Sequence, residues 1–215
     1  MSSLFGILCL LSALVATSYA LSCTHCFSNE ATCSGPSLTC SSGQHCGTTY
    51  RETIAAGLKS ISLTRSCTLA TQCGFRGTVG IQHGNIRMGT SCCNSDNCTP
   101  SLPSLPIRSS YTNGLVCRSC KSDDSARCHT ADTIECTGDE NMCLLQTTHE
   151  SGSASASSAI RGCATESICN LGSQSASAGG VIRDIKFICT SGGLSAHTTV
   201  LAPAIVCLLL LKLFF

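Results

Sequence analysis

The 215-residue chain has no tryptophan and few charged residues, a composition that is unusual for a cytosolic enzyme or a nucleic-acid-binding protein. Aromatic residues make up 4% of the sequence and charged residues 12%, with a formal net charge of +1. That balance is too weak to attract a nucleic-acid backbone. Nucleophile elbows, metalloprotease helices and phosphate loops are also missing. We therefore expect a protein that is not an enzyme, uses no cofactor or metal and binds no nucleic acid.

Cysteine is what the sequence has in excess, with 20 residues in 215. This content is typical of a disulfide scaffold made in an oxidising compartment. The spacing repeats: Cys117 lies 94 positions after Cys23, and Cys189 lies 97 positions after Cys92. The first series is Cys23, Cys26, Cys33, Cys40, Cys46, Cys67, Cys73 and Cys92, and the second is Cys117, Cys120, Cys128, Cys136, Cys143, Cys163, Cys169 and Cys189. The pattern predicts two tandem copies of one domain, of which only the first adds Cys93 and Cys98.

The amino-terminal segment reads as a signal peptide covering residues 1–20. An apolar run, Leu4–Val15, leads to Ser18-Tyr19-Ala20, which supplies small residues at the positions that signal peptidase requires. An amino-terminal membrane anchor is the alternative, although the run is shorter than the ~20 residues of a membrane span.

The carboxy-terminal segment, residues 191–215, reads as a signal for a glycosylphosphatidylinositol (GPI) anchor. Small and polar residues from Ser191 to Thr199 precede an apolar run from Val200 to Phe215. Ser191 is the expected attachment residue and Gly193 the second choice. A spanning helix is the alternative. We expect a protein on the outer membrane leaflet at the cell surface, with shedding into the extracellular space as a further fate.

Alternating Thr, Ser, Ile and Leu residues predict hairpins between the cysteines. In the first copy the expected strands are Gly47–Thr53 and Lys59–Ser66, around a turn at Ala55-Ala56-Gly57. A further hairpin is expected within Gly74–Thr90, with Gly80 and His83-Gly84-Asn85 as breakers.

The second copy repeats this layout with low-complexity connections. Its expected strands are Leu144–His149, Ile160–Gly162 and Val181–Ile188. Ser151–Ser158 is expected as the loop of the middle hairpin and Ser173–Gly180 as a flexible approach to the last strand. Pro100, Pro103 and Pro106 mark a linker between the copies. The predicted domains are residues 21–99 and 116–190, with the linker at residues 100–115.

These residues carry a resemblance to a known family. Cys23-x-x-Cys26, Cys46-Gly47-Thr48-Thr49 and Cys92-Cys93-x-x-x-x-Cys98 resemble the three-finger domain of the lymphocyte-antigen-six/urokinase-receptor family. The two-domain layout, with Asn113-Gly114 ahead of Cys117, is similar to that of gamma-type phospholipase A2 inhibitors. The resemblance implies an all-β fold of two disulfide-rich three-finger (snake-toxin-like) domains in tandem.

The resemblance also implies a pairing of the cysteines, which spacing alone does not determine. The implied bridges are Cys23–Cys46, Cys26–Cys33, Cys40–Cys67, Cys73–Cys92 and Cys93–Cys98 in the first domain, and Cys117–Cys143, Cys120–Cys128, Cys136–Cys163 and Cys169–Cys189 in the second.

Three other kinds of motif in the sequence have alternative chemical interpretations. The Cys-x-x-Cys pairs at Cys23 and Cys117 are typical of zinc knuckles and redox motifs, but exported thiols oxidise and no βαβ frame surrounds them. Asp123-Asp124 and Asp139-Glu140 are carboxylate pairs expected at the solvated surface. Asn97-Cys98-Thr99 is a formal glycosylation motif whose middle residue is expected to be bridged.

Two functions from different classes follow. The first is a GPI-anchored recognition protein that binds an extracellular protein ligand or co-receptor through its hairpins. The second, implied by the resemblance, is an inhibitor that sequesters secreted phospholipase A2. A coat protein without a dedicated ligand is a third alternative. The expected contact residues, chosen because aromatic and arginine side chains are favoured at interfaces, are Tyr50, Arg51, Leu58, Lys59, Arg76 and Arg87.

Overall fold

The computed structural model of the chain describes residues 20–152, 155–178 and 181–192. Most of the predicted signal peptide, the second-choice anchor residue Gly193 and the apolar carboxy-terminal run lie outside the described residues. Within the described ranges, no helix has the length and apolar character needed to cross a membrane.

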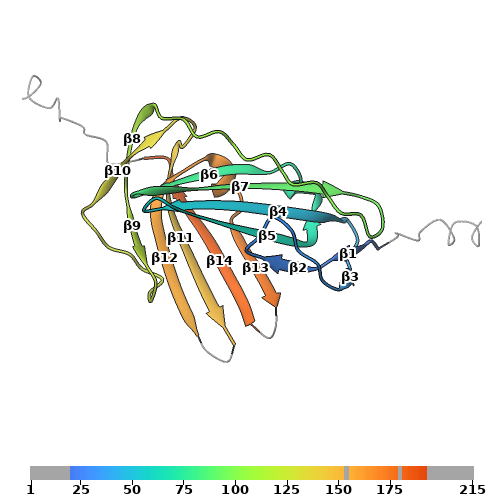
Figure 1. The fold of residues 1–215 in the computed structure, drawn as a ribbon. Helices are drawn as coiled ribbons and strands as arrows, with labels where there is room; N and C mark the ends of the chain where they lie inside the picture. The colour runs from blue at the N-terminus through green and yellow to red at the C-terminus, as the bar shows by residue number, and fades with distance from the viewer. Residues whose placement is uncertain (1–19, 153–154, 179–180, 193–215) are drawn as a thin grey trace, which may run out of the picture.

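In the described residues, the regular secondary structure is almost entirely β-strand (Figure 1). The first half contains β1 (Ser22–Thr24), β2 (Cys26–Ser28), β3 (Ser37–Thr39), β4 (Gln44–Ala55), β5 (Leu58–Leu69), the 3-10 turn η1 (Ala70–Gln72), β6 (Arg76–Ile81) and β7 (Gly84–Cys93). The second half contains β8 (Thr112–Arg118), β9 (Cys120–Ser122), β10 (Thr133–Thr137), β11 (Met142–Ser151), β12 (Ala156–Ala164), the short helix α2 (Glu166–Cys169), β13 (Ser173–Ala178) and β14 (Val181–Thr190). The all-β prediction with two three-finger domains is confirmed.

The predicted central hairpin of the first domain is present and longer than expected. β4 pairs with β5 from Gln44↔Leu69 to Ala55↔Leu58, which leaves Ala56 and Gly57 as a two-residue turn. Both turn residues have positive φ, as a hairpin turn that matches strand twist requires.

Three of the local predictions were wrong. Gly80 is not a breaker but pairs with Asn85 inside the β6–β7 hairpin. Ser173–Gly180 was expected to be flexible, yet Ser173–Ala178 forms β13 and pairs with β14. The Ser/Ala loop of the middle hairpin is shorter than expected, because β12 already begins at Ala156. Small polar residues are weak strand formers, and here an ordered neighbouring strand outweighs that weakness.

The nine disulfides of the structure join the same nine pairs that the family resemblance implied. The buried cores inside the two domains consist mainly of these sulfurs. Cys23, Cys40 and Cys46 form the buried cluster of the first domain, and Cys117, Cys136 and Cys163 form that of the second. Small domains depend on such bridges because they bury too little apolar area.

The long strands of both domains belong to one ten-stranded sheet in the order β13-β14-β11-β12-β6-β7-β4-β5-β2, with β9 also paired to β12. Figure 1 shows the strands of the second domain running at a steep angle to those of the first. The junction is the antiparallel pairing of β6 with β12, through Cys163↔Gly80 and Ala164↔Val79. A Cβ atom on Gly162 would lie 2.0 Å from the Gly80 carbonyl oxygen, so the backbones approach closely only because Gly162 has no side chain.

The largest apolar cluster lies across this junction. Its buried members are Val79 and Ile86 from the first domain and Leu144, Ala164 and Ile168 from the second. Hydrogen bonds reinforce the contact: Thr165 N donates to Thr78 O (3.1 Å), and the Ser167 hydroxyl donates to Arg76 O (2.6 Å). The main apolar core of the protein is therefore shared between the domains.

A candidate binding pocket between the domains

A pocket of about 380 Å³ lies where the hairpin tips of the first domain meet the second domain. We call it the interdomain pocket. The first domain contributes the β4 end around Ala55 and the β6–β7 tip around His83. The second domain contributes β9 and β12, through Lys121 and Ile160. The side chains of Ile81, Ile86 and Ile160 give it an aliphatic wall.

Two cations line this pocket, Arg51 in the middle of β4 and Lys121 on β9. Lys121 is 62% exposed and pairs with Asp123, which leaves Arg51 as the cation without an ion-pair partner among the described residues. The Arg51 side chain is half-buried, and its buried Nε atom has no hydrogen-bond partner among the described residues. Burial lowers the pKa of the Arg51 guanidinium, and the positive charge of Arg183 in the second domain lowers it further. The guanidinium is held in a place that disfavours its charge.

A shallower groove of about 670 Å³ adjoins the pocket and shares Arg51 and Thr53 with it. We call it the adjoining groove. Its other residues come from Asn29 and from the start of β5 at Lys59–Ser62. Pocket and groove together form a recessed surface in which Arg51 and Thr53 belong to both parts.

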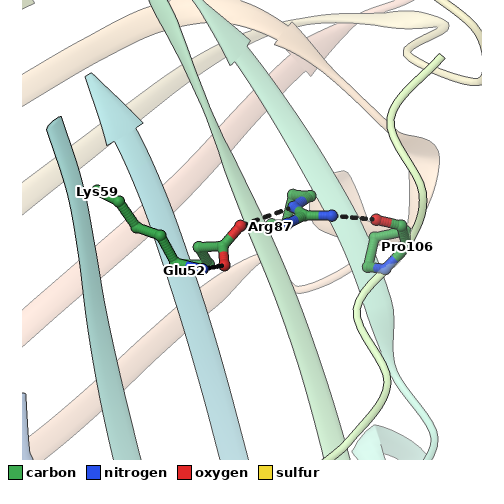
Figure 2. Close-up of polar contacts among 4 residues, drawn as sticks. All are labelled: Glu52, Lys59, Arg87 and Pro106. Atoms are coloured by element: carbon green, nitrogen blue, oxygen red, sulfur yellow. Dashed lines mark hydrogen bonds and ion pairs between the residues drawn. The ribbon is translucent and has the colours of Figure 1, made fainter. Parts of the chain in front are cut away.

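The next residue along β4 carries a buried carboxylate. Glu52 is 4% exposed and lies between two cations, Lys59 on β5 and Arg87 on β7 (Figure 2). Arg87 is directly opposite Glu52 in the β4–β7 ladder and donates from Nε to Glu52 Oε1 at 3.1 Å. The hydrogen bonds from Lys59 first, and then from Arg87, lower the pKa of Glu52.

Arg87 also connects this charge cluster to the linker. Its Nη1 atom donates to the Pro106 carbonyl oxygen at 3.3 Å, as Figure 2 shows. The Thr48 hydroxyl donates to Pro100 O at 3.4 Å, and the linker returns along β7 in Figure 1. Because side chains alternate along a strand, Arg51 and Glu52 point to opposite faces of the sheet. The linker therefore covers the Glu52 face and leaves the pocket face uncovered.

The cysteine clusters offer no metal site. The sulfur atoms of Cys23, Cys40 and Cys67 lie within 4.8 Å of one another, and those of Cys117, Cys136 and Cys163 do the same. Each of these atoms belongs to a disulfide, so none is a thiolate that could bind zinc.

The two carboxylate pairs, Asp123-Asp124 and Asp139-Glu140, have different surroundings in the structure. Asp123 is exposed and pairs with Lys121, and the Asp124 carboxylate accepts a hydrogen bond from Ser122. Asp139 is exposed as expected. For Glu140 the expectation of a solvated surface was wrong, because this side chain is buried and accepts hydrogen bonds from the Thr137 backbone and hydroxyl. Neither pair lies in the interdomain pocket.

A sequence model of the u-PAR/Ly-6 domain matches this chain twice, over residues 19–101 and 113–197. The chain belongs to the u-PAR/Ly-6 domain family. The sequence is 30% identical to the phospholipase A2 inhibitor NAI of Notechis ater over 76% of this chain and 83% of that protein. It is 29% identical to the 25 kDa subunit of a phospholipase A2 inhibitor of Naja kaouthia, over 70% and 83%. It is 31% identical to the urokinase plasminogen activator surface receptor of Mus musculus, over 69% of this chain and 46% of the receptor.

The structure does not bring together the six residues that the sequence suggested for ligand contact. Arg51 and Lys59 border the recessed surface, although Lys59 also pairs with Glu52. Arg87 is engaged by Glu52 and the linker. Leu58 is 78% exposed at the tip of the central hairpin. The other two are Tyr50, half-buried on β4, and Arg76, exposed on β6.

The sequence reasoning missed the part of the pocket that the second domain supplies. No sequence pattern near Lys121 or Ile160 indicates that they line a pocket, because their position there depends on how β12 pairs with β6. The Glu52–Lys59 pair did have a signal. With a turn at Ala56-Gly57, hairpin register places these two residues diagonally across β4 and β5.

Asn97 and Ser191 are both exposed in the structure. Both polar atoms of the Asn97 side chain form hydrogen bonds. Its Oδ1 atom accepts one from the Ser37 hydroxyl at 2.7 Å, and its Nδ2 atom donates one to the Asp96 carboxylate at 3.1 Å. Glycosylation of Asn97 stays a prediction.

The lowered pKa of Glu52 predicts a stability that depends on pH. A carboxyl whose pKa is lower in the folded chain stabilises the fold above its unfolded-state pKa, and loses this effect as the pH falls through the folded-state value. Glu52→Gln should therefore lower the free energy of unfolding by about 1–3 kcal/mol at neutral pH, and by less at about pH 3, which lies below the ordinary pKa of a glutamate. Guanidinium unfolding with the disulfides intact measures both.

Glu150→Gln is the matched control for this prediction. Glu150 pairs with Arg183, whose side chain is 53% exposed, so its loss should cost less than about 1 kcal/mol at either pH. A Glu52→Gln effect that is equally large at both pH values would show that the ion pairs are not its cause.

Proposed function

We propose that this protein is a non-enzymatic, GPI-anchored recognition protein of the cell surface, with the anchor at Ser191. Its ligand is an extracellular protein, which binds over the recessed surface formed by the interdomain pocket and the adjoining groove. The disulfide-bridged domains hold that surface in place, as rigid scaffolds do for binding loops.

The observation that carries this proposal is the recessed surface around Arg51. It combines an aliphatic wall from both domains with a cation that has an unpaired buried atom, and the linker leaves it uncovered. Mostly apolar concavities with a few polar groups are where proteins bind ligands, and arginine is enriched among the residues that dominate binding energy. The names of the relatives agree with binding, since one is an inhibitor of an enzyme and another a receptor for one.

A second candidate is sequestration of secreted phospholipase A2. It is favoured by the match to the Notechis ater inhibitor, which extends over 83% of that protein and includes both domains. The two candidates share one binding mode and differ in the partner.

Proximity labelling on intact cells tests the recognition function. The wild-type chain should label a reproducible extracellular partner, and the double charge reversal R51E/K59E should reduce that labelling about tenfold or more, because both residues border the recessed surface. R108E/R127E is the matched control, since it makes the same change of charge at two exposed arginines. Equal labelling by wild type and R51E/K59E would remove the recessed surface from the proposal.

Purified secreted phospholipase A2 separates the two candidates. If the protein is a phospholipase inhibitor, the ectodomain should bind this enzyme and lower its rate of phospholipid hydrolysis, and R51E/K59E should weaken both effects. If the ectodomain neither binds nor inhibits while a different surface partner is labelled, the inhibitor candidate is wrong.

Phosphatidylinositol-specific phospholipase C tests the anchor. Treatment of intact cells should release the protein into the medium, because Ser191 follows the last disulfide by two residues and precedes a small, polar spacer. Release is also expected if Gly193 carries the glycolipid, and the carboxy-terminal peptide distinguishes the two. Protein that stays on the membrane and yields a peptide from residues 201–215 would show a spanning segment instead.

A further inference from the structure

Among the described residues, no carboxylate forms an ion pair with the half-buried guanidinium of Arg51. Glu52 pairs with Lys59 and Arg87, Glu150 pairs with Arg183, and Asp123 pairs with Lys121. Among the described residues, Arg51 Nε has no hydrogen-bond partner. Partial burial disfavours a charge that has no paired anion, so an anion placed at this guanidinium would stabilise it.

The remainder of the pocket is suited to an apolar group. Ile81 and Ile86 from the first domain and Ile160 from the second line it, beside the small side chains of Ala55 and Ala56. Its volume of about 380 Å³ falls in the range of small-molecule sites, roughly 300–1,000 Å³. A cavity of ~150 Å³ already holds benzene, so this one has room for a medium-length alkyl chain.

The charge and the shape together define a ligand class. We propose that the interdomain pocket binds a small amphipathic carboxylate, with its carboxylate on the Arg51 guanidinium and its alkyl part against Ile81, Ile86 and Ile160. A guanidinium donates two parallel hydrogen bonds to a planar carboxylate, which favours this head group over an alcohol. This site does not require the protein partner of the proposed function, and the two can fail separately.

Titration calorimetry with octanoate tests the proposal on the ectodomain, residues 21–191, which holds both domains and all nine disulfides. Octanoate should bind saturably with one site per chain. Acetate, which lacks the alkyl chain, and octyltrimethylammonium, which has the opposite charge, should each bind at least about tenfold more weakly. No saturable octanoate binding at millimolar concentration, or equal binding of octyltrimethylammonium, would overturn the proposal.

Variants locate the site. Arg51→Gln should weaken octanoate binding about tenfold or more, and Arg51→Lys, which keeps the charge but not the fork, should have an intermediate affinity. Ile160→Phe, which fills the pocket, should also weaken binding. Arg127→Gln, at an exposed arginine of the second domain, is the matched control and should bind as wild type does. Unchanged affinity in Arg51→Gln would contradict the assignment.

Two further readouts separate loss of the site from loss of the fold. Arg51→Gln removes a desolvated charge, so its thermal midpoint without ligand should equal or exceed that of the wild type. In methyl NMR spectra, octanoate should shift the signals of Ile81, Ile86 and Ile160. Shifts confined to the exposed residues Ile182 and Ile188 would show surface adsorption and refute binding in the pocket.

Discussion

The structure depends on the apolar contact between its two domains. Inside each domain the buried core is mainly disulfide sulfur, whereas the largest apolar cluster takes Val79 and Ile86 from one domain and Leu144 and Ile168 from the other. The bridges limit how far each domain can unfold, and burial of aliphatic side chains then favours the docked arrangement. The β6–β12 pairing extends one sheet through this core, so the domains are joined by backbone as well as by side chains.

The pocket exists because the two domains dock on each other and because the side chains of β4 alternate between the two faces of the sheet. Arg51 and Glu52 are neighbours in sequence, yet their surroundings differ. Glu52 has two cationic partners and lies under the linker, whereas Arg51 faces the junction and has no counter-ion within the part of the chain that the structure describes. The same strand therefore contributes to stability on one face and, in our proposal, to binding on the other. The cost of holding an unpaired guanidinium at the junction is what makes an anionic group the expected occupant.

The sequence predicted the domains' internal architecture better than their arrangement. Cysteine spacing revealed the repeat, and the Ala56-Gly57 turn fixed the central hairpin, because both signals are local or periodic. β13 was missed because its Ser and Ala residues have low strand propensity and pair only through β14. Ile160 and Lys121 could not be assigned to a site, since no local pattern reports which strand of one domain will dock on the other.

If the two domains form one folding unit around the shared core, scanning calorimetry of the disulfide-intact ectodomain shows it most directly. We expect a single heat-absorption peak whose calorimetric enthalpy equals its van't Hoff enthalpy, because a shared core is lost in one step. Two separable peaks, or a calorimetric enthalpy about twice the van't Hoff value, would show instead that the domains unfold independently and that the core does not couple them.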